Sequence, residues 1–338
     1  MKRSKWYSDK DFLNVQKIDA HIHMNTRHSY FNEVARENNF TLLSINTEVP
    51  EYPLLPDQQE IILEQQSHFD QSVFHLTSFD TSGISEEGWS EKALEYVKES
   101  IDKGACGVKV WKNIGMDLKR EDGSFVMICD REFDEIFGYL EARSIPVLGH
   151  IGEPRNCWLP IEEMTVDNDR NYYSQHPEFH MYHHPEYPGY NDLINSRDQL
   201  LENHPDLLFI GAHLGSLEWS VDEVAIRLDK YSNLYVDLTD RICHLQYQSF
   251  SERNKIKDFF YAYQDRIIYG TDLEFFDGHT RADVFRESQN VWMRDWKYFV
   301  TDEEMVVPAL DSPVEGLKLE ASVVDKIYRE NAKKCYRI

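Results

Sequence analysis

Short apolar or β-branched runs recur eight times along the 338-residue chain, and longer amphipathic stretches such as 91–103, 132–142 and 221–231 separate them. Strands that alternate with helices favour parallel pairing through right-handed crossovers. Eight such units close into a (β/α)8 TIM barrel, so we expect one α/β domain over 1–338. The predicted strands are 15–23, 41–49, 72–80, 107–113, 145–153, 207–215, 234–240 and 267–274.

An open doubly wound sheet is the alternative for alternating strands and helices. Such a sheet is expected to carry a glycine-rich phosphate loop, and the chain contains neither G-x-G-x-x-G nor a P-loop. The sequence therefore favours the barrel.

Two connections are much longer than the others: 154–206 after the fifth predicted strand and 275–319 after the eighth. Long loops at the carboxyl ends of barrel strands cover the active site. The first connection is rich in Tyr, His and Pro, which predicts an ordered lid insertion. The second opens a C-terminal extension over 275–338.

The composition restricts the partners of the chain. It has 60 acidic and 36 basic residues, a formal net charge of -24, and 41% hydrophobic residues, which indicates a large core rather than disorder. An acidic chain is repelled by nucleic acids and by anionic membrane surfaces. We expect a small-molecule substrate as partner; a homodimer is common among such barrels.

The five cysteines are scattered and form no C-x-x-C pair. This excludes a disulfide framework and a thiolate zinc site, and it favours a reducing, cytoplasmic compartment. Residues 1–10 lack the apolar segment of a signal peptide, although a signal already removed would leave the same sequence. No apolar stretch approaches the roughly 20 residues of a membrane span.

Side chains that can bind a metal stand at the predicted carboxyl ends of several strands. His21 and His23 are two residues apart on the first strand, so both point to one face, as two ligands of one divalent ion would. Taken singly, such residues are usually structural, as core histidines or helix caps. Four strands that bring nitrogen or oxygen ligands to one barrel end predict a metal site. The strand-end residues are His21, His23, Lys109, Lys112, His150, Glu153, His213, Asp237, Asp240, Arg241 and Asp272.

Four motifs carry a family resemblance: Asp-Ala-His-Ile-His at 19–23, Gly-His-Ile-Gly-Glu-Pro at 149–154, Gly-Ala-His-Leu-Gly at 211–215 and Gly-Thr-Asp at 270–272. Together they resemble the amidohydrolase superfamily, and more narrowly the amidohydrolase-related metal-dependent hydrolases that include aminocarboxymuconate semialdehyde decarboxylase. The resemblance extends over nearly the whole chain. It departs after Gly-Thr-Asp, where many relatives have a proline nearby and this chain continues Leu-Glu-Phe-Phe. That departure concerns the pocket wall.

The resemblance implies roles for five residues. His21, His23, His150 and Asp272 are expected to bind one divalent metal ion, with zinc first and manganese, iron and cobalt as the other N/O-ligated choices. His213 is expected to act as acid or base beside the metal. Asp272 is expected to shuttle a proton as well.

Lys109 decides between one metal ion and two. In binuclear amidohydrolases a carboxylated lysine on the fourth strand bridges two metals, whereas in the decarboxylase-like branch the site is usually mononuclear and such a lysine binds substrate. We favour one metal, with Lys109 at the mouth of the site paired with an anionic oxygen of the substrate.

Further residues are candidates for substrate binding, each with a structural alternative. Glu153 and Arg155 line the predicted pocket or form a loop salt bridge, Arg241 holds a carboxylate or pairs with a surface acid, and Trp111 stacks on a ring or packs in the core. The His183-His184 pair is predicted to pack in the lid or to touch substrate.

These features predict a metal-dependent hydrolase in which a metal-activated water cleaves a C–O or C–N bond. A lactone or amide of a carboxylate or sugar-acid type is the expected substrate. Non-oxidative decarboxylation is the rival reaction. A catalytically inactive barrel that only binds ligand is the rival of another class, and the complete ligand set argues against it.

Overall fold

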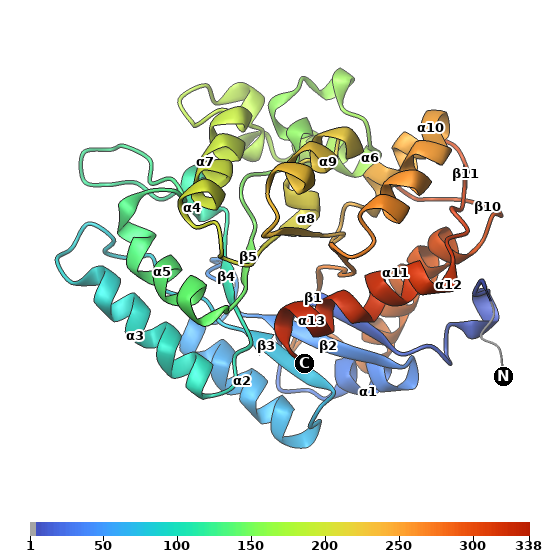
Figure 1. Cartoon of the computed structure of the whole chain (residues 1–338), viewed down its shortest axis with the longest axis horizontal. Helices are drawn as coiled ribbons and strands as arrows, with labels where there is room; N and C mark the ends of the chain where they lie inside the picture. Colours follow the sequence, from blue (N-terminus) through green and yellow to red (C-terminus); the bar gives the residue numbers. More distant parts are fainter. Residues whose placement is uncertain (1–4) are drawn as a thin grey trace.

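The computed structural model describes residues 5–338 and contains parallel strands that alternate with helices (Figure 1). One strand lies within or overlaps each of the eight predicted runs, and every pairing between these strands is parallel. The strands are β1 (Lys17–Asn25), β2 (Phe40–Ile45), β3 (Val73–Leu76), β4 (Val108–Val110), β5 (Val147–Gly149), β6 (Phe209–Gly211), β7 (Leu234–Asp237) and β8 (Ile267–Ile268).

Backbone hydrogen bonds join these strands in circular order. Strands β1–β3 and β4–β8 form two parallel arrays. At one seam, the Thr77 amide donates to the Gly107 carbonyl at 3.0 Å and the Lys109 amide donates to the Thr77 carbonyl at 2.7 Å. At the other, the Ala20 amide donates to the Tyr269 carbonyl at 3.1 Å. The predicted (β/α)8 TIM-barrel fold is confirmed.

The eighth predicted strand is divided in the structure. After β8 the chain turns at 270–272 and then forms β9 (Leu273–Phe276), which pairs in parallel with the carboxyl half of β1. This turn places residue 272 beside β1, at the end of the barrel where the candidate ligands lie.

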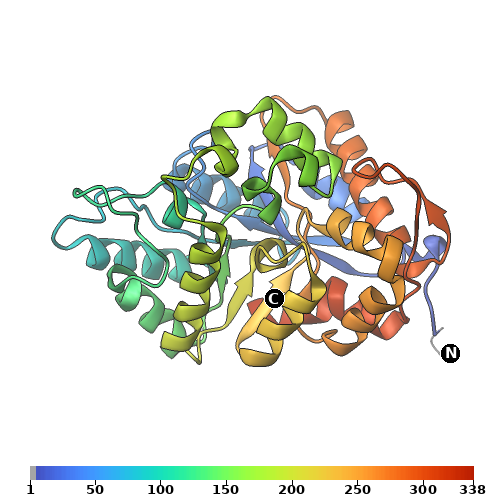
Figure 2. The ribbon, with the colours of Figure 1, turned by 90° about the horizontal axis from the view of Figure 1, so that it is seen from above.

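Helices cover the outside of the strands (Figures 1 and 2). Their apolar residues recur at helical spacing, as in α9, where Val221, Val224 and Leu228 are buried. The α-helices and one π-helical turn are α1 (Tyr30–Glu37), α2 (Leu55–His68), α3 (Trp89–Asp102), α4 (Asn113–Met116), α5 (Asp134–Arg143), α6 (Asp167–Gln175), α7 (Tyr190–Asn203), α8 (Ala212–Gly215), α9 (Val221–Lys230), α10 (Ile242–Ala262), α11 (Arg281–Val300), α12 (Ala321–Asp325), the π-helical turn (Lys326–Glu330) and α13 (Asn331–Tyr336).

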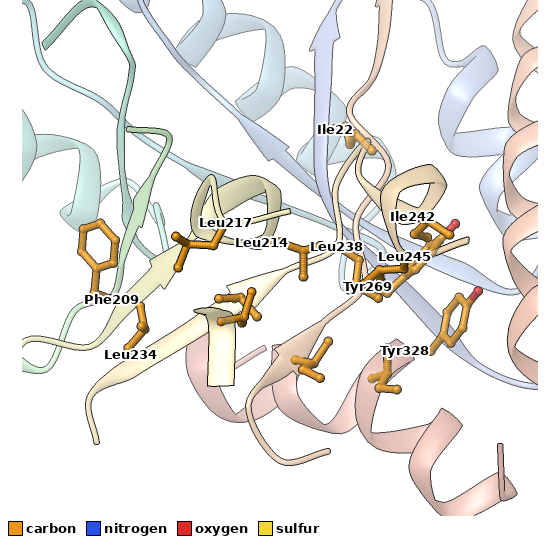
Figure 3. Packing of buried hydrophobic residues seen from close by; sticks show 14 of the residues in the cluster. Ile22, Phe209, Leu214, Leu217, Leu234, Leu238, Ile242, Leu245, Tyr269 and Tyr328 are labelled. Atoms are coloured by element: carbon orange, nitrogen blue, oxygen red, sulfur yellow. The ribbon is translucent and has the colours of Figure 1, made fainter. Parts of the chain in front are cut away.

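The buried hydrophobic side chains of the strands belong to two clusters. Alternate residues of the strands, such as Ile18, Leu148 and Ile210, form one cluster, which the C-terminal residues extend. Their neighbours belong to the larger cluster under the helices. Figure 3 shows this second layer, in which Phe209 and Leu234 are register partners on β6 and β7. The alternation is that of parallel strands buried on both faces.

The predicted lid is ordered, and its irregular part ends where α7 begins. Between β5 and α7 the chain makes four 3-10 turns (Arg155–Trp158, Ile161–Glu163, Pro177–Phe179 and Met181–His183) and helix α6. Cys157, Met164, Tyr173 and Met181 give this segment a small core of its own.

The segment after the eighth strand contains more helix and strand than the long loop that the sequence predicts. Most of 275–300 is α11, an outer barrel helix that packs on α1. The following part forms the hairpin of β10 (Glu304–Met305) and β11 (Val314–Glu315), and between its strands the Ala309 carbonyl accepts a hydrogen bond from Asp167 of the lid. No helix in residues 5–338 combines the length and apolar character needed to cross a bilayer.

Candidate functional site

Two histidines on β1 direct their Nε2 atoms toward one point. Both side chains are buried, and each uses Nδ1 for a hydrogen bond: His21 with Asp237 Oδ2 at 2.7 Å and His23 with the Ile45 carbonyl at 2.9 Å. A hydrogen bond at one ring nitrogen fixes the ring and leaves the other nitrogen as a ligand. These contacts therefore prepare both Nε2 atoms for metal binding.

The turn after β8 brings Asp272 to the two histidines. A Cβ at position 270 would lie 2.5 Å from Thr239 Oγ1 and 2.8 Å from His21 Cβ, so glycine permits the close approach. Asp272 has φ +68°, and its amide donates to the His21 carbonyl at 2.9 Å. Its Oδ1 lies 3.4 Å from His21 Nε2 and 3.3 Å from His23 Nε2.

His213 lies on the other side of the Asp272 carboxylate, with its Nε2 4.0 Å from Oδ2. It follows β6 directly in the strained turn α8, with φ +58°, and its Nδ1 hydrogen-bonds the Thr239 carbonyl at 3.0 Å. Ligand atoms of His21, His213 and Asp272 lie within 4.8 Å of one another, the one such group of three within residues 5–338.

His150, at the end of β5, completes the set from another strand. Its ring centroid lies 4.1 Å from that of His213, and its Nε2 is buried without a hydrogen-bond partner among the described residues. A buried nitrogen without a partner costs free energy unless something binds it. The orphaned Nε2 thus fits a metal ligand, and the three imidazoles and one carboxylate assigned from the sequence suit a divalent ion.

The protonation states also suit a metal. Burial lowers the pKa of His213 to about 3 and lowers the pKa values of His21 and His150, so all three rings are neutral at physiological pH. Burial opposes ionisation of Asp272 as well, but its contacts, foremost that with His23 Nε2, outweigh burial and hold the pKa of this carboxyl well below the usual range. Metal ligands must be deprotonated in this way.

Lys109 lies deeper than the sequence predicts. Its side chain is 1% exposed rather than at the mouth, and Nζ lies 3.2 Å from His21 Nε2. The backbone pairing of β4 with β5 directs this side chain inward. Burial lowers the pKa of the Lys109 ammonium to about 8, despite the nearby carboxylates.

The predicted substrate residues have partners of their own. Glu153 forms an ion pair with Lys112, so its salt-bridge alternative is realised. The Arg155 guanidinium lies 4.1 Å from the ring centroid of Trp219. Arg241 is buried and donates to Asp240, while its buried Nε has no hydrogen-bond partner within residues 5–338.

Two further predictions concern aromatic rings. Trp111 is half-buried, and Lys112 Nζ lies 5.9 Å from its ring centroid. In the lid, His183 packs on the His180 ring at 4.7 Å, and His184 hydrogen-bonds the Pro177 carbonyl at 3.1 Å. Lid packing, one of the predicted roles of the His183-His184 pair, accounts for both rings.

Two residues at the site have no role in the sequence-based assignment. Asp237 is the last residue of β7, and its carboxylate is buried. A buried carboxylate at the end of a barrel strand indicates a functional residue, but the sequence does not indicate its role. Tyr52 places its ring centroid 5.2 Å from that of His23 and donates a hydrogen bond to Glu274. Nothing in the local sequence distinguishes Tyr52 from other loop tyrosines.

A cavity of about 530 Å³ opens beside Tyr52. Its lining is mostly apolar, from the loop after β2 and from α3, with Trp89, Ala93 and Tyr96 among the residues. This volume is within the range of small-molecule sites. The half-buried Glu48 lies in its wall, and burial raises the pKa of this carboxyl to about 7.

A family model described as amidohydrolase matches residues 82–338. The chain belongs to the amidohydrolase family. The matched region contains His150, His213 and Asp272, whereas His21 and His23 precede it. The predicted resemblance is confirmed, and membership places the chain among metal-dependent enzymes. No curated protein sequence matches the chain.

Solved structures show the same fold at low sequence identity. An uncharacterized TIM-barrel protein from Bordetella bronchiseptica is 13% identical with a TM-score of 0.54, over 96% of this chain and 99% of that one. 2,6-Dihydroxybenzoate decarboxylase from Rhizobium is 14% identical with a TM-score of 0.52, over 95% and 98%. A dihydroxybenzoic acid decarboxylase from Polaromonas, solved with manganese and 2-nitroresorcinol, is 13% identical with a TM-score of 0.51, over 95% and 97%.

Proposed function

We propose that this amidohydrolase-family chain is a metal-dependent hydrolase of a small polar lactone or amide. One observation carries the proposal: three histidines from β1 and β6 each commit Nδ1 to a hydrogen bond and present Nε2 to the carboxylate of Asp272. A barrel that had lost catalysis and only bound a ligand would be expected to lack at least one of these side chains.

His21, His23, His150 and Asp272 would hold the ion. Zinc is the first expectation for these ligands, and manganese, iron and cobalt also suit them. A divalent metal in this position supplies Lewis acidity toward water and substrate oxygen. The side chains of β1 face Oδ1 of Asp272 and leave Oδ2 to His213, and we assign the acid–base role to His213.

His213 and Asp272 would move the protons of the reaction. The Thr239 carbonyl holds Nδ1–H of the neutral His213 ring, so the free Nε2 can accept a proton from water. The Asp272 carboxylate, 4.0 Å away, can relay it to the leaving group. Both residues have positive φ, a strain that a functional site accommodates.

A carboxylate-bearing substrate such as a sugar-acid lactone or amide suits the cations near the centre. Lys109 would pair with an anionic oxygen beside the ligands, and the free Nε of Arg241 offers a further donor. Glu153, Arg155 and Trp111 would contribute from the β4 and β5 loops. We keep the mononuclear assignment as part of this proposal.

Non-oxidative decarboxylation is the second candidate. Two of the structural neighbours with TM-scores above 0.5 are named as dihydroxybenzoate-type decarboxylases. The same cations would bind the carboxylate of an aromatic acid. The fold likeness alone does not choose between the two reactions.

Metal analysis and a two-arm substrate screen test the proposal. We expect about one metal ion per chain, acid release from lactones or amides, and no turnover in His213→Asn protein purified in parallel. Release of CO2 from hydroxybenzoates without hydrolysis of any lactone or amide would establish the decarboxylase instead. Two metals per chain would overturn the mononuclear assignment.

A further inference from the structure

A second cavity, of about 650 Å³, lies at the opposite end of the barrel from the candidate metal centre. The first residues of β1, β2 and β3 and the C-terminal segment form its wall. Lys17 is six residues before His23 on β1, which corresponds to roughly 20 Å along the strand. The full lining is Gln16, Lys17, Ile18, Arg36, Asn39, Phe40, Thr41, Gln71, Ser72, Phe74, Arg329, Lys333, Arg337 and Ile338.

The charge of this lining opposes that of the chain. Five of its fourteen residues are lysine or arginine and none is aspartate or glutamate, although acidic residues outnumber basic ones by 60 to 36 in the sequence. The cations come from separate segments: Arg36 from the end of α1, and Arg329, Lys333 and Arg337 from the C-terminal helical turns. The fold gathers them at one place.

Three of these cations have no acidic partner within residues 5–338. The Arg36 guanidinium lies 5.8 Å from the ring centroid of Phe69, and none of Arg36, Lys333 and Arg337 has a side-chain ion pair in that range. All three are exposed at the cavity. By contrast, Arg329 pairs with Glu330, and Lys17 donates to the carbonyls of Phe12 and Val15.

Neutral hydrogen-bonding groups stand between the cations. Asn39, Thr41 and Gln71 line the cavity, and no side-chain hydrogen bond engages them among the described residues. Asn39 and Gln71 have φ of +59° and +60°, where the chain turns into β2 and β3. Phosphate oxygens accept hydrogen bonds from guanidinium groups and from side-chain amides. The cavity therefore brings together the donors that a phosphate group needs.

We propose that this cavity binds a small phosphorylated anion. Its volume is that of a small-molecule site, and its guanidinium groups can make bidentate contacts to phosphate. The net charge of -24 repels anions at long range, so binding depends on these local contacts and weakens with added salt. The inference is independent of the reaction at the metal centre.

Calorimetric titration of the metal-loaded protein with pyrophosphate at low ionic strength tests the site. We expect saturable binding of one pyrophosphate per chain, weakened about tenfold or more in a triple variant, Arg36→Gln, Lys333→Gln and Arg337→Gln. A second triple variant, Lys98→Gln, Lys119→Gln and Arg143→Gln, changes the net charge equally at exposed cations that contact tyrosine or phenylalanine rings elsewhere. It should bind as the unaltered protein does.

Three outcomes of the pyrophosphate titrations would overturn the proposal. They are the lack of saturable binding, equal weakening in both triple variants, and undiminished binding in the first triple variant, which would assign pyrophosphate to the metal centre. A parallel titration with citrate separates phosphate from polycarboxylate chemistry, and tighter binding of citrate would refute the phosphate assignment. Thermal melts without ligand show that both variants are folded.

Discussion

The carboxylate of Asp237 lies 2.7 Å from Nδ1 of His21. Its other oxygen accepts a hydrogen bond from the His213 main-chain amide at 2.6 Å. One buried side chain on β7 therefore orients a histidine of β1 and fixes the turn that carries the histidine of β6. Hydrogen bonds of this kind to metal-binding histidines set both ring orientation and basicity.

Asp237→Asn should lower metal affinity by about 10–100-fold. An amide presents one acceptor and one donor where the carboxylate presents two acceptors, so either His21 Nδ1–H or the His213 amide loses its partner. Competition with a chelator measures the affinity. Asp222→Asn, at an exposed position on α9, is the matched control and should bind metal normally. Unchanged affinity in Asp237→Asn would contradict the positioning role.

His213→Asn should reduce turnover by about 10²–10⁴-fold while the metal stays bound. The reason is that Nε2 of His213 faces Oδ2 of Asp272, on the side away from His21 and His23. Metal content and kcat are measured on the same preparation. Loss of the metal together with activity would make His213 a ligand instead.

Glu218→Gln should change how stability depends on pH. Glu218 is 1% exposed, and burial raises the pKa of its carboxyl to about 7 despite the field of Arg241. The folded state then holds a proton that the unfolded state releases between pH 4.5 and 7, so this residue's contribution to stability is present below pH 4.5 and lost as the pH rises through 7.

Because glutamine does not titrate, the variant should gain about 2–3 kcal/mol in unfolding free energy relative to the unaltered protein between pH 4.5 and pH 8. Urea denaturation at both pH values measures the difference. Glu95→Gln, at an exposed position of α3, is the control and should show no such change. A constant difference for Glu218→Gln would disprove the shift.

Trp292→Phe should cost about 2–4 kcal/mol of unfolding free energy. The indole is fully buried, stacks on Phe40 at 4.2 Å and donates to Asp19 Oδ2 at 2.8 Å. Asp19 also accepts two hydrogen bonds from Thr271, beside Asp272, so α11 supports the turn at the centre. Urea denaturation compares it with Trp6→Phe at a half-exposed position; equal losses would refute the prediction.

The strands, and the strand ends at which the candidate ligands lie, could be predicted from the sequence because their signals are local. Alternation of apolar runs with amphipathic segments predicts parallel strands, and two histidines at i and i+2 must share a face of β1. The division of the last strand into β8 and β9 was not predictable. A glycine inside an apolar run does not reveal which side chains from distant parts of the sequence pack against it. Gly270 is required by His21 and Thr239, both distant in sequence.

The sequence by itself determined the barrel fold, the strand ends at which the candidate ligands lie, and the family. Only the tertiary structure decided that Asp237 orients His21 and holds the turn of His213, that Lys109 is buried beside His21 rather than at the mouth, and that Glu153 is paired with Lys112. The physical reason is the distance along the sequence over which each signal acts. Periodicity fixes which face a side chain takes within one strand, whereas its partner depends on the register between strands far apart in the chain.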